Sequence, residues 1–179
     1  MNARIKNVIN TNKKGLLFIA KIVTIYAALE GFYSFYLTTE TNIDRWLIEI
    51  IIEQSEWLLT LMGYQIIDTT LANEFHMGIA GSSGVIIGGP CDGLSLFILF
   101  ASFIIAFGGK WSFNVLYLIL GISFIHFLNI IRVVALALIV VHSPESLDFH
   151  HSYTFTLFVY GVVFLLWIWR IQLFQRKEW

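Results

Sequence analysis

Long apolar runs separated by short polar segments make up most of the chain. Four of these runs approach or exceed the roughly 20 residues that a helix needs to cross the hydrocarbon core of a bilayer. They cover residues 16–37, 91–107, 111–142 and 152–170. The third is too long for one perpendicular crossing, so we expect it to tilt, kink or project from the membrane. The pattern predicts an all-α polytopic membrane protein with about four transmembrane helices.

Residues 43–62 follow a different pattern, that of an amphipathic helix. Apolar side chains recur there at three- and four-residue intervals, and Trp46 and Trp57 are among them. The other faces carry the charged residues Asp44, Arg45, Glu49, Glu53 and Glu56. So many charges would be costly at the centre of a bilayer. We therefore expect this helix to lie in the outer interface, at a depth that suits tryptophan.

Residues 63–90 lack both patterns. This segment is rich in Gly and Ser and contains short β-branched runs such as Val85, Ile86 and Ile87. Such a composition predicts a small β-hairpin or loop cap on the outer side of the membrane. We see no internal repeat and no soluble second domain. Residues 1–179 are therefore predicted to form a single membrane-embedded domain.

The distribution of charge predicts how the chain is oriented. Charged residues make up only 13% of the chain, against about 25% in a typical soluble domain. The net charge of −1 says nothing about nucleic acid, and what matters is where the charges lie. No nucleic-acid partner is expected. Basic residues gather before the first span, in the turn after the second and after the last, at Arg4, Lys6, Lys13, Lys14, Lys110, Arg170, Arg176 and Lys177. By the positive-inside rule these regions, and so both termini, are predicted to be cytoplasmic.

Three chemically active residues are predicted to lie at one depth. A helix rises about 1.5 Å per residue, so Cys91 and Arg132 lie roughly 28 and 33 Å from the inner turn at Lys110. His151 lies roughly 28 Å from Arg170 at the inner end of the last span. A thiol, an imidazole and a guanidinium on neighbouring spans therefore meet the outer face together.

These three groups suit nucleophilic chemistry on a carbonyl. A thiolate is a strong nucleophile, and a nearby cation or histidine favours that form. Histidine can take up and return the proton, and arginine can stabilise an oxyanion. Each residue also has a structural interpretation, because Cys91 could be packing, Arg132 a snorkelling anchor and His151 an interfacial residue. Arg132 is the hardest to explain in that way, since apolar residues flank it on both sides.

Three motifs, in order and on successive spans, resemble those of the exosortase/archaeosortase family. They are the segment 89–94 (Gly-Pro-Cys-Asp-Gly-Leu), the segment 129–133 (Asn-Ile-Ile-Arg-Val) and His151 before the last span. The aromatic end of the chain looks like the short exosortase variants of Bacteroidetes. The resemblance implies a membrane-integral cysteine transpeptidase or protease. Such an enzyme cleaves the C-terminal sorting tails of secreted proteins at the outer membrane–water interface, through a thioester on Cys91.

The resemblance also implies a role for each site residue. Cys91 would be the nucleophile, His151 the general acid and base, and Arg132 the partner of an oxyanion or a substrate carboxyl. Asn129, one helical turn before Arg132, could hold the guanidinium or the substrate backbone. Asp92 follows Cys91 directly, where its charge would disfavour a thiolate unless Arg132 or His151 compensates.

The adjacent His150 is an alternative to His151, because the two differ by one position. A metal site built from His76, His142, His150 and His151 is not favoured, since no pair has the i, i+4 spacing of helical zinc ligands. We expect no cofactor.

The resemblance further implies the partners and the location of the protein. The partners would be the sorting tail of a secreted protein, membrane lipid and an acceptor that is a lipid or a glycan. The protein would be a multi-pass protein of the bacterial inner membrane, with its active site on the periplasmic side.

Two other functions are alternatives to the enzyme. One is a non-enzymatic accessory subunit of a secretion or polysaccharide-export system, in which Cys91 only fills space. The other is a small transporter that uses the charges Lys21, Glu30 and Arg132. A transporter should show internal symmetry or paired broken helices, and the sequence shows neither.

Overall fold

The computed structural model describes residues 13–37, 42–67, 75–88 and 91–175, and most of these are helical. The long helices are α2 (Lys13–Phe32), which continues into the π-helix η1 (Tyr33–Leu37), α4 (Ile43–Leu61), α5 (Leu94–Phe107), α6 (Trp111–His142) and α8 (Phe155–Gln175). Three short elements lead from α6 into α8, namely η3 (Pro144–Ser146), α7 (Leu147–Phe149) and the π-helix η4 (His150–Thr154).

In the part of the chain that the structure describes, three helical stretches are long and apolar enough to cross a membrane. They are Lys13–Phe35, Trp111–His142 and Pro144–Gln175. The chain is therefore a multi-pass membrane protein built mainly of helices. α5, the second predicted span, is apolar but has only 14 residues. It begins at Leu94 rather than at residue 91, because Gly93 has a left-handed backbone (φ +81°) that the helix cannot include.

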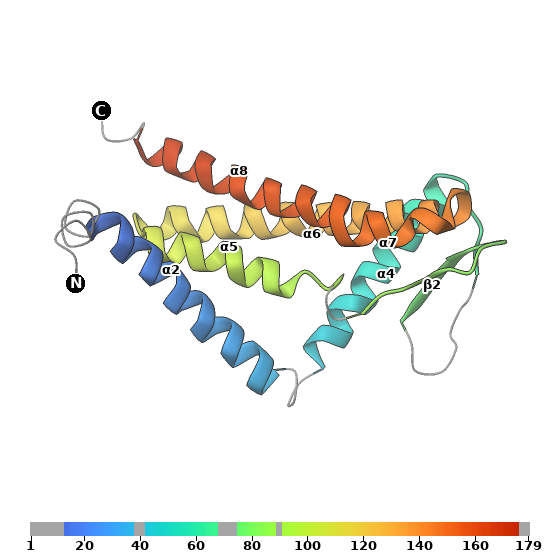
Figure 1. Cartoon of the computed structure of the whole chain (residues 1–179), viewed down its shortest axis with the longest axis horizontal. Coiled ribbons are helices and arrows are strands. Elements are labelled where there is room, and N and C mark those ends of the chain that lie inside the picture. The colour runs from blue at the N-terminus through green and yellow to red at the C-terminus, as the bar shows by residue number, and fades with distance from the viewer. Residues whose placement is uncertain (1–12, 38–41, 68–74, 89–90, 176–179) are drawn as a thin grey trace, which may run out of the picture.

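The helices form a bundle with two different ends (Figure 1). At one end, the basic end, α2 begins, the α5–α6 turn carries Lys110, and α8 finishes. At the other end, the cap end, α4 and the strands lie beside the second half of α6 (Figure 1). The 32 residues of α6 rise about 48 Å, well beyond a hydrocarbon core of about 30 Å. α6 therefore runs through the bundle and projects into the cap, one of the solutions expected for so long a run.

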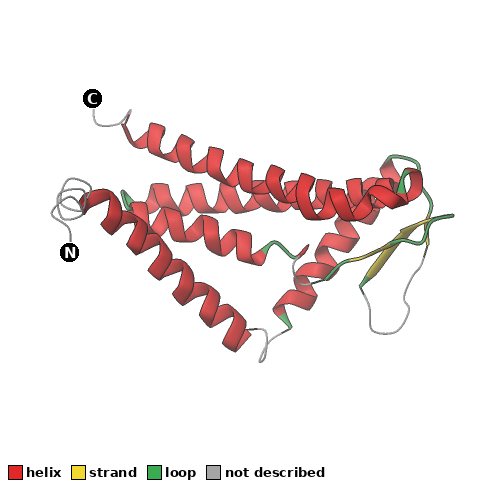
Figure 2. Ribbon diagram, viewed as in Figure 1, coloured by secondary structure: helices red, strands yellow, loops and turns green. Residues whose placement is uncertain are grey.

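The cap contains a small antiparallel sheet (Figure 2). Its order is β1-β2-β3, formed by β1 (Ile66–Ile67), β2 (His76–Ile79) and β3 (Val85–Ile86). β2 and β3 form the predicted hairpin, with His76 opposite Ile86, and β1 adds a third strand, with Ile66 opposite Ile79. The sheet therefore has one strand more than a hairpin alone.

Two apolar clusters form the cores of the two ends of the molecule. The bundle cluster centres on Phe100, Phe103, Ile104, Tyr117, Ile125 and Val163. The cap cluster joins α4, the sheet and the second half of α6 through Ile48, Ile51, Leu59, Met77, Ile79, Ile87, Val133, Val134 and Ala137, and it includes Cys91. Because Cys91 belongs to the cap cluster and precedes α5, it lies where cap and bundle meet.

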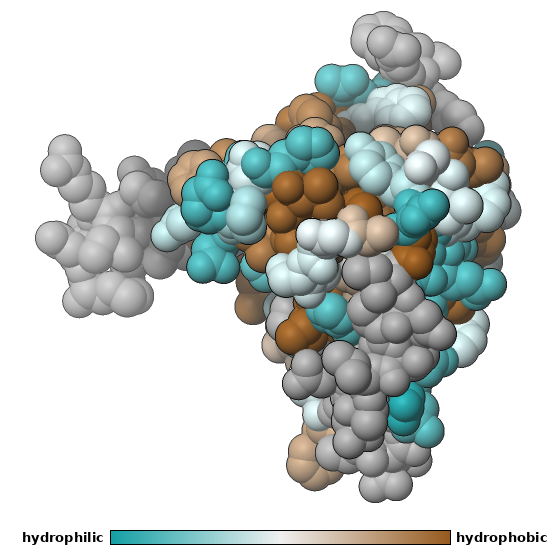
Figure 3. Space-filling model, turned by 90° about the vertical axis from the view of Figure 1, so that its right-hand side faces the viewer, coloured by the Kyte–Doolittle hydropathy of each residue, from teal (hydrophilic) through white to brown (hydrophobic). Residues whose placement is uncertain are grey.

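The outer surfaces of bundle and cap differ. Bundle helices expose large apolar side chains, for example Leu17, Leu120 and Leu165, each about 60% exposed or more. The cap end, seen end-on in Figure 3, mixes hydrophilic and hydrophobic residues. This contrast is typical of a bundle that faces lipid and a cap that faces water.

Two charges that interrupt the first span have partners on α5. The Lys21 ammonium donates a hydrogen bond to the carbonyl oxygen of Ala106 (3.0 Å), near the end of α5. The Ser95 hydroxyl donates to Glu30 Oε1 (2.8 Å), at the start of α5. Both ends of α5 are thereby fastened to α2.

Candidate functional site

Cys91 is held in place through its backbone. Its N–H donates to the carbonyl of Gly88 (2.8 Å), and its own carbonyl accepts from Asn129 Nδ2 (2.7 Å). Asn129 is fully buried on α6 and Cys91 is 7% exposed. Asn129 therefore binds the backbone of the nucleophile candidate, rather than a guanidinium as the sequence allowed. A Cβ atom on Gly93 would lie 3.5 Å from Asn129 Nδ2, which is van der Waals contact. Gly93 and Asn129 are therefore packed against each other.

Cys91, Arg132 and His151 meet at one point, and we call them the triad. Arg132, one helical turn after Asn129, is buried, and its Nη2 lies 3.5 Å from Cys91 Sγ. His151, at the start of the last helix, places Nε2 at 3.6 Å from the same sulfur. Arg132 Nη2 and His151 Nε2 are 3.3 Å apart. Each of the three groups is thus in contact with the other two.

The contact between Arg132 and His151 favours a neutral imidazole. A guanidinium nitrogen can only donate a hydrogen bond. A bond from Arg132 Nη2 to His151 Nε2, 3.3 Å away, needs the tautomer that carries its proton on Nδ1. In this form Nε2 is the nitrogen that could take a proton from the neighbouring thiol once the bond from Arg132 gives way.

The choice between His150 and His151 depends on a π-helix. Both lie in η4, whose wider turn changes the direction of successive side chains. His151 points to Cys91. His150 instead places Nδ1 3.1 Å from Thr154 Oγ1, and its ring packs against Phe149 and Phe155. The structure brings His151, and not His150, to the sulfur.

Asp92 turns to the start of α5 and to Tyr33. Its Oδ1 accepts the N–H of Leu94 (2.7 Å). The Tyr33 hydroxyl lies 3.3 Å from Asp92 Oδ2 and 2.8 Å from Asp44 Oδ1. Within the described part of the chain, Asp92 makes no hydrogen bond to the triad. Burial, joined by the charge of Asp44, raises the pKa of Asp92, while the bond from Leu94 acts in the opposite direction.

A cavity of about 460 Å³ adjoins the triad on the side of the bundle. We call it the bundle-side cavity. It is bounded by η1, the start of α5, α6 and the start of α8, through Tyr33, Asp92, Gly93, Ser95, Leu96, Arg132, His151, Ser152, Phe155, Thr156, Val159 and Tyr160. Its wall is partly polar and partly apolar.

Other polar residues singled out in the sequence are used elsewhere. His126 Nε2 lies 2.8 Å from Gln54 Oε1 and joins α6 to α4. In residues 13–37, 42–67, 75–88 and 91–175, no three His, Cys, Asp or Glu side chains gather as a metal ion would require. Sequence reasoning missed Tyr33, which lines the cavity and contacts Asp92. The one sequence feature that could have indicated Tyr33 is its hydroxyl group near the end of an apolar run.

Fold and site together define a multi-pass membrane protein in which a buried thiol contacts an imidazole and a guanidinium. Residues 15–169 match the family described as transmembrane exosortase (Exosortase_EpsH), and the chain belongs to this family. Comparisons with curated proteins and with solved structures gave no match.

Proposed function

We propose that the chain is a membrane-integral cysteine transpeptidase or protease. It cleaves the C-terminal sorting tails of secreted proteins at the outer membrane–water interface, through a thioester on Cys91. The observation that carries this proposal is the mutual contact of Cys91 Sγ, His151 Nε2 and Arg132 Nη2, all within 3.3 to 3.6 Å. Membership of the exosortase family agrees with a membrane transpeptidase.

The triad supplies each group that the first half-reaction needs. The Cys91 sulfur bonds to the peptide carbonyl carbon while His151 Nε2 takes the thiol proton. The carbonyl oxygen becomes an oxyanion, and the Arg132 guanidinium stabilises it. The C–N bond then breaks, and His151 gives its proton to the departing amine. The products are a thioester on Cys91 and the released tail.

The position of Arg132 in the wall of the bundle-side cavity supports its role toward the oxyanion. A carbonyl that enters the cavity would meet the guanidinium beside the Cys91 sulfur. Arg132 Nε itself is buried and has no hydrogen-bond partner among the described residues, which is costly.

The bundle-side cavity supports a tail as the substrate. Ser95, Ser152 and Thr156 give the wall hydroxyl groups for a peptide backbone, and Leu96 and Val159 give it an apolar part. A sorting tail likewise combines a short polar motif with an apolar span. Its span would continue beside the bundle helices, inside the bilayer.

The location is also part of the proposal. Lys13, Lys14 and Lys110 lie at the basic end of the bundle. The positive-inside rule favours this end as the cytoplasmic one, in the inner membrane of a bacterium. The triad would then be on the periplasmic side, where secreted proteins pass.

Substitution of Cys91 tests the function. We expect Cys91→Ala and Cys91→Ser to insert in the membrane but to stop cleavage of a co-expressed secreted protein that ends in an apolar span and a basic cluster. The measurement is the mass of the secreted protein and of any acyl adduct on Cys91. Ser112→Ala, an exposed position near the basic end, is the control and should process normally. Normal processing by Cys91→Ala would contradict the proposal and favour an accessory subunit.

A further inference from the structure

A second cavity, of about 330 Å³, reaches His151 from the cap. We call it the cap-side cavity. Its wall consists of His76, Ser83, Gly84, Val85, Ile86, Leu136, Leu147, Asp148 and His151. Among the described residues that line the two cavities, His151 alone is common to both. The imidazole therefore stands between two separate spaces.

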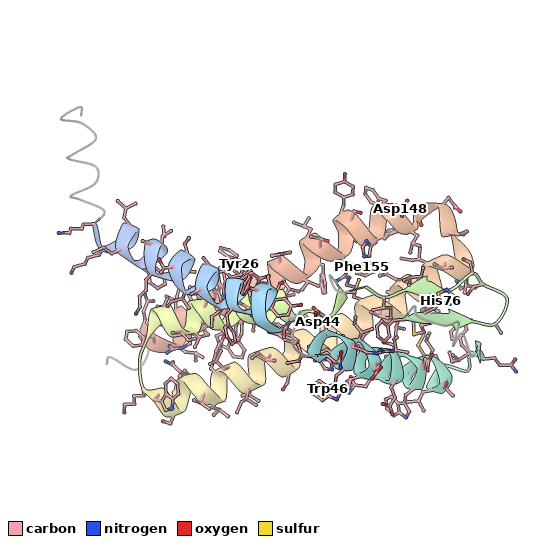
Figure 4. All side chains as sticks on the ribbon, turned by 90° about the horizontal axis from the view of Figure 1, so that it is seen from below. Tyr26, Asp44, Trp46, His76, Asp148 and Phe155 are labelled. Carbon is pink, nitrogen blue, oxygen red and sulfur yellow. The ribbon has the colours of Figure 1, made fainter. Side chains whose placement is uncertain are left out.

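The two spaces lie in different directions along the molecule (Figure 4). Phe155, from the bundle-side cavity, lies nearer the bundle, whereas Asp148 and His76, from the cap-side cavity, lie farther toward the cap (Figure 4). The cap-side cavity is formed by the β2–β3 hairpin, α6 and α7, and no residue of α2, α5 or α8 lines it. A ligand in it would not compete for space with a tail in the bundle-side cavity.

The rim of the cap-side cavity is a closely packed turn. His76 Nε2 lies 2.9 Å from the carbonyl oxygen of Ser83. Gly84 has φ +73°, and a Cβ on it would lie 2.7 Å from the His76 ring and from the Met77 carbonyl oxygen. Only glycine lets the backbone pass so close to this imidazole. The hairpin is thus held over the cavity in one conformation.

We propose that the cap-side cavity is the acceptor site of the second half-reaction, and that the acceptor is a primary amine. This inference rests on the proposed function, because it needs a thioester on Cys91. The tail and its departing amine occupy the bundle-side cavity. A second nucleophile held in the cap-side cavity can approach the same imidazole without displacing a tail from the bundle-side cavity.

The charge in the cavity wall favours an amine. Asp148, three residues before His151, contributes a carboxylate. No Lys or Arg lines the cavity within the described residues, so a phosphate or carboxylate ligand would have no cationic partner there. An ammonium group would pair with Asp148, and the aliphatic side chains of Val85, Ile86 and Leu147 would contact the carbon chain that carries it.

The second step balances with the groups present. The ammonium gives one proton to water, and the free amine attacks the thioester carbonyl. His151 Nε2 takes a second proton from the attacking nitrogen. An amide bond forms, the C–S bond breaks, and His151 returns that proton to the Cys91 sulfur. Enzyme and imidazole finish in their starting states, and no oxidant or reductant is needed.

An activated ester allows this step to be tested without the natural substrate. The full-length protein, in lipid nanodiscs, is treated with p-nitrophenyl acetate to place an acetyl group on Cys91, with Cys91→Ala as the blank. Propylamine or 1-propanol, two probes of nearly equal size but different charge, is then added. Loss of the acetyl group is followed by intact mass, and the small products are identified.

We expect propylamine to speed the loss of the acetyl group and to yield N-propylacetamide, with little effect from 1-propanol. Asp148→Asn keeps the shape but removes the charge, so half-maximal rate should need about tenfold more propylamine, as expected for loss of one charged hydrogen bond. Glu145→Gln, an exposed carboxylate nearby that does not line the cavity, is the matched control and should behave as wild type.

The outcomes separate the two proposals. If folded wild-type protein forms no acetyl thioester on Cys91, the proposed function fails and the acceptor site fails with it. If the thioester forms but propylamine acts equally on wild type and Asp148→Asn, the acceptor site is wrong while the proposed function stands. Equal or faster transfer to 1-propanol would overturn the amine class.

Discussion

Arg132 is the residue on which the chemistry of the site depends most. It is buried in α6, and its Nη2 contacts both the Cys91 sulfur and the His151 imidazole. Because it can only donate, it favours the neutral form of His151. Its Nε is buried and has no hydrogen-bond partner among the described residues. In the proposed reaction, one guanidinium would thus act on the nucleophile, the base and the developing charge.

A change from Arg132 to lysine tests this dependence. Lysine keeps the positive charge but loses the planar fork, so it cannot serve two partners and a substrate oxygen together. We expect Arg132→Lys to lower the rate of thioester formation about 100-fold or more, as for loss of an oxyanion donor. The rate is measured by mass after treatment with the activated ester. Arg45→Lys, an exposed position on α4, should leave the rate unchanged, and a wild-type rate in Arg132→Lys would reduce Arg132 to an anchor.

Among the elements, α5 differs most from a simple transmembrane helix. Its 14 residues span about 21 Å, less than the hydrocarbon core. Backbone groups at its ends would be unpaired in lipid, and polar side chains bind them. Asp92 accepts from the N–H of Leu94, Lys21 donates to Ala106, and Asn114 Nδ2 donates to the carbonyl of Gly108 (3.1 Å).

The capping role of Asp92 predicts how its variants behave. Asp92→Ala should lose about 1 kcal/mol of stability, the usual cost of a lost cap, because the N–H of Leu94 loses its partner. Asp92→Asn keeps an acceptor for that N–H and should be close to wild type near neutral pH. Thermal unfolding in detergent measures both. An Asn variant as unstable as the Ala variant would show that the charge, and not the cap, matters.

The ionisation of Asp92 also predicts that the stability of the folded protein depends on pH. Since burial raises the pKa of Asp92 in the folded state, the folded protein binds the proton more tightly than the unfolded chain does. Stability from this group therefore falls as the pH rises from the ordinary pKa of aspartate through the raised value. Asp92→Asn should lack this component, and unfolding curves recorded across that range should reveal the difference. Identical pH profiles for the two proteins would contradict the assignment.

Periodicity and helix rise were enough to predict the helices and the shared depth of the triad, but not the finer geometry. Depth follows from counting residues along a helix, whereas the π-helical turn that selects His151 over His150 has no signal in the sequence. The start of α5 at Leu94 depends on a left-handed Gly93 that apolarity hides. The contacts of Asn129 and Asp92 arise between elements far apart in the chain, so local patterns could not specify them.

On the scale of the whole molecule, the two ends of the bundle are stabilised in different ways. The cap end has an apolar cluster next to the triad. The basic end has a buried cation, Arg170, which is 1% exposed. Its Nη2 donates to Gly108 O (3.0 Å) and Asn114 Oδ1 (2.7 Å), and its guanidinium lies 4.9 Å from the ring centres of Phe107 and Phe113. Arg170 thereby fastens α8 to the α5–α6 turn.

Removal of Arg170 should affect stability far more than chemistry. We expect Arg170→Met to lose roughly 2–4 kcal/mol, because two charged hydrogen bonds and the ring contacts disappear. Arg170→Lys, which keeps a charge, should lose less. At a temperature where the protein stays folded, thioester formation should change less than about threefold, since the triad lies at the opposite end. A fall as large as that in Arg132→Lys would show that the two ends are coupled.

The short α5 has a consequence for the membrane itself. A helix about 9 Å shorter than the surrounding hydrocarbon layer forces the lipids beside it to compress or tilt. Such compression would draw headgroups and water down along α5 to the level of Cys91. The protein would thus thin its own bilayer locally. A peptide bond that begins inside the hydrocarbon layer would then meet water and the Cys91 thiol without leaving the membrane.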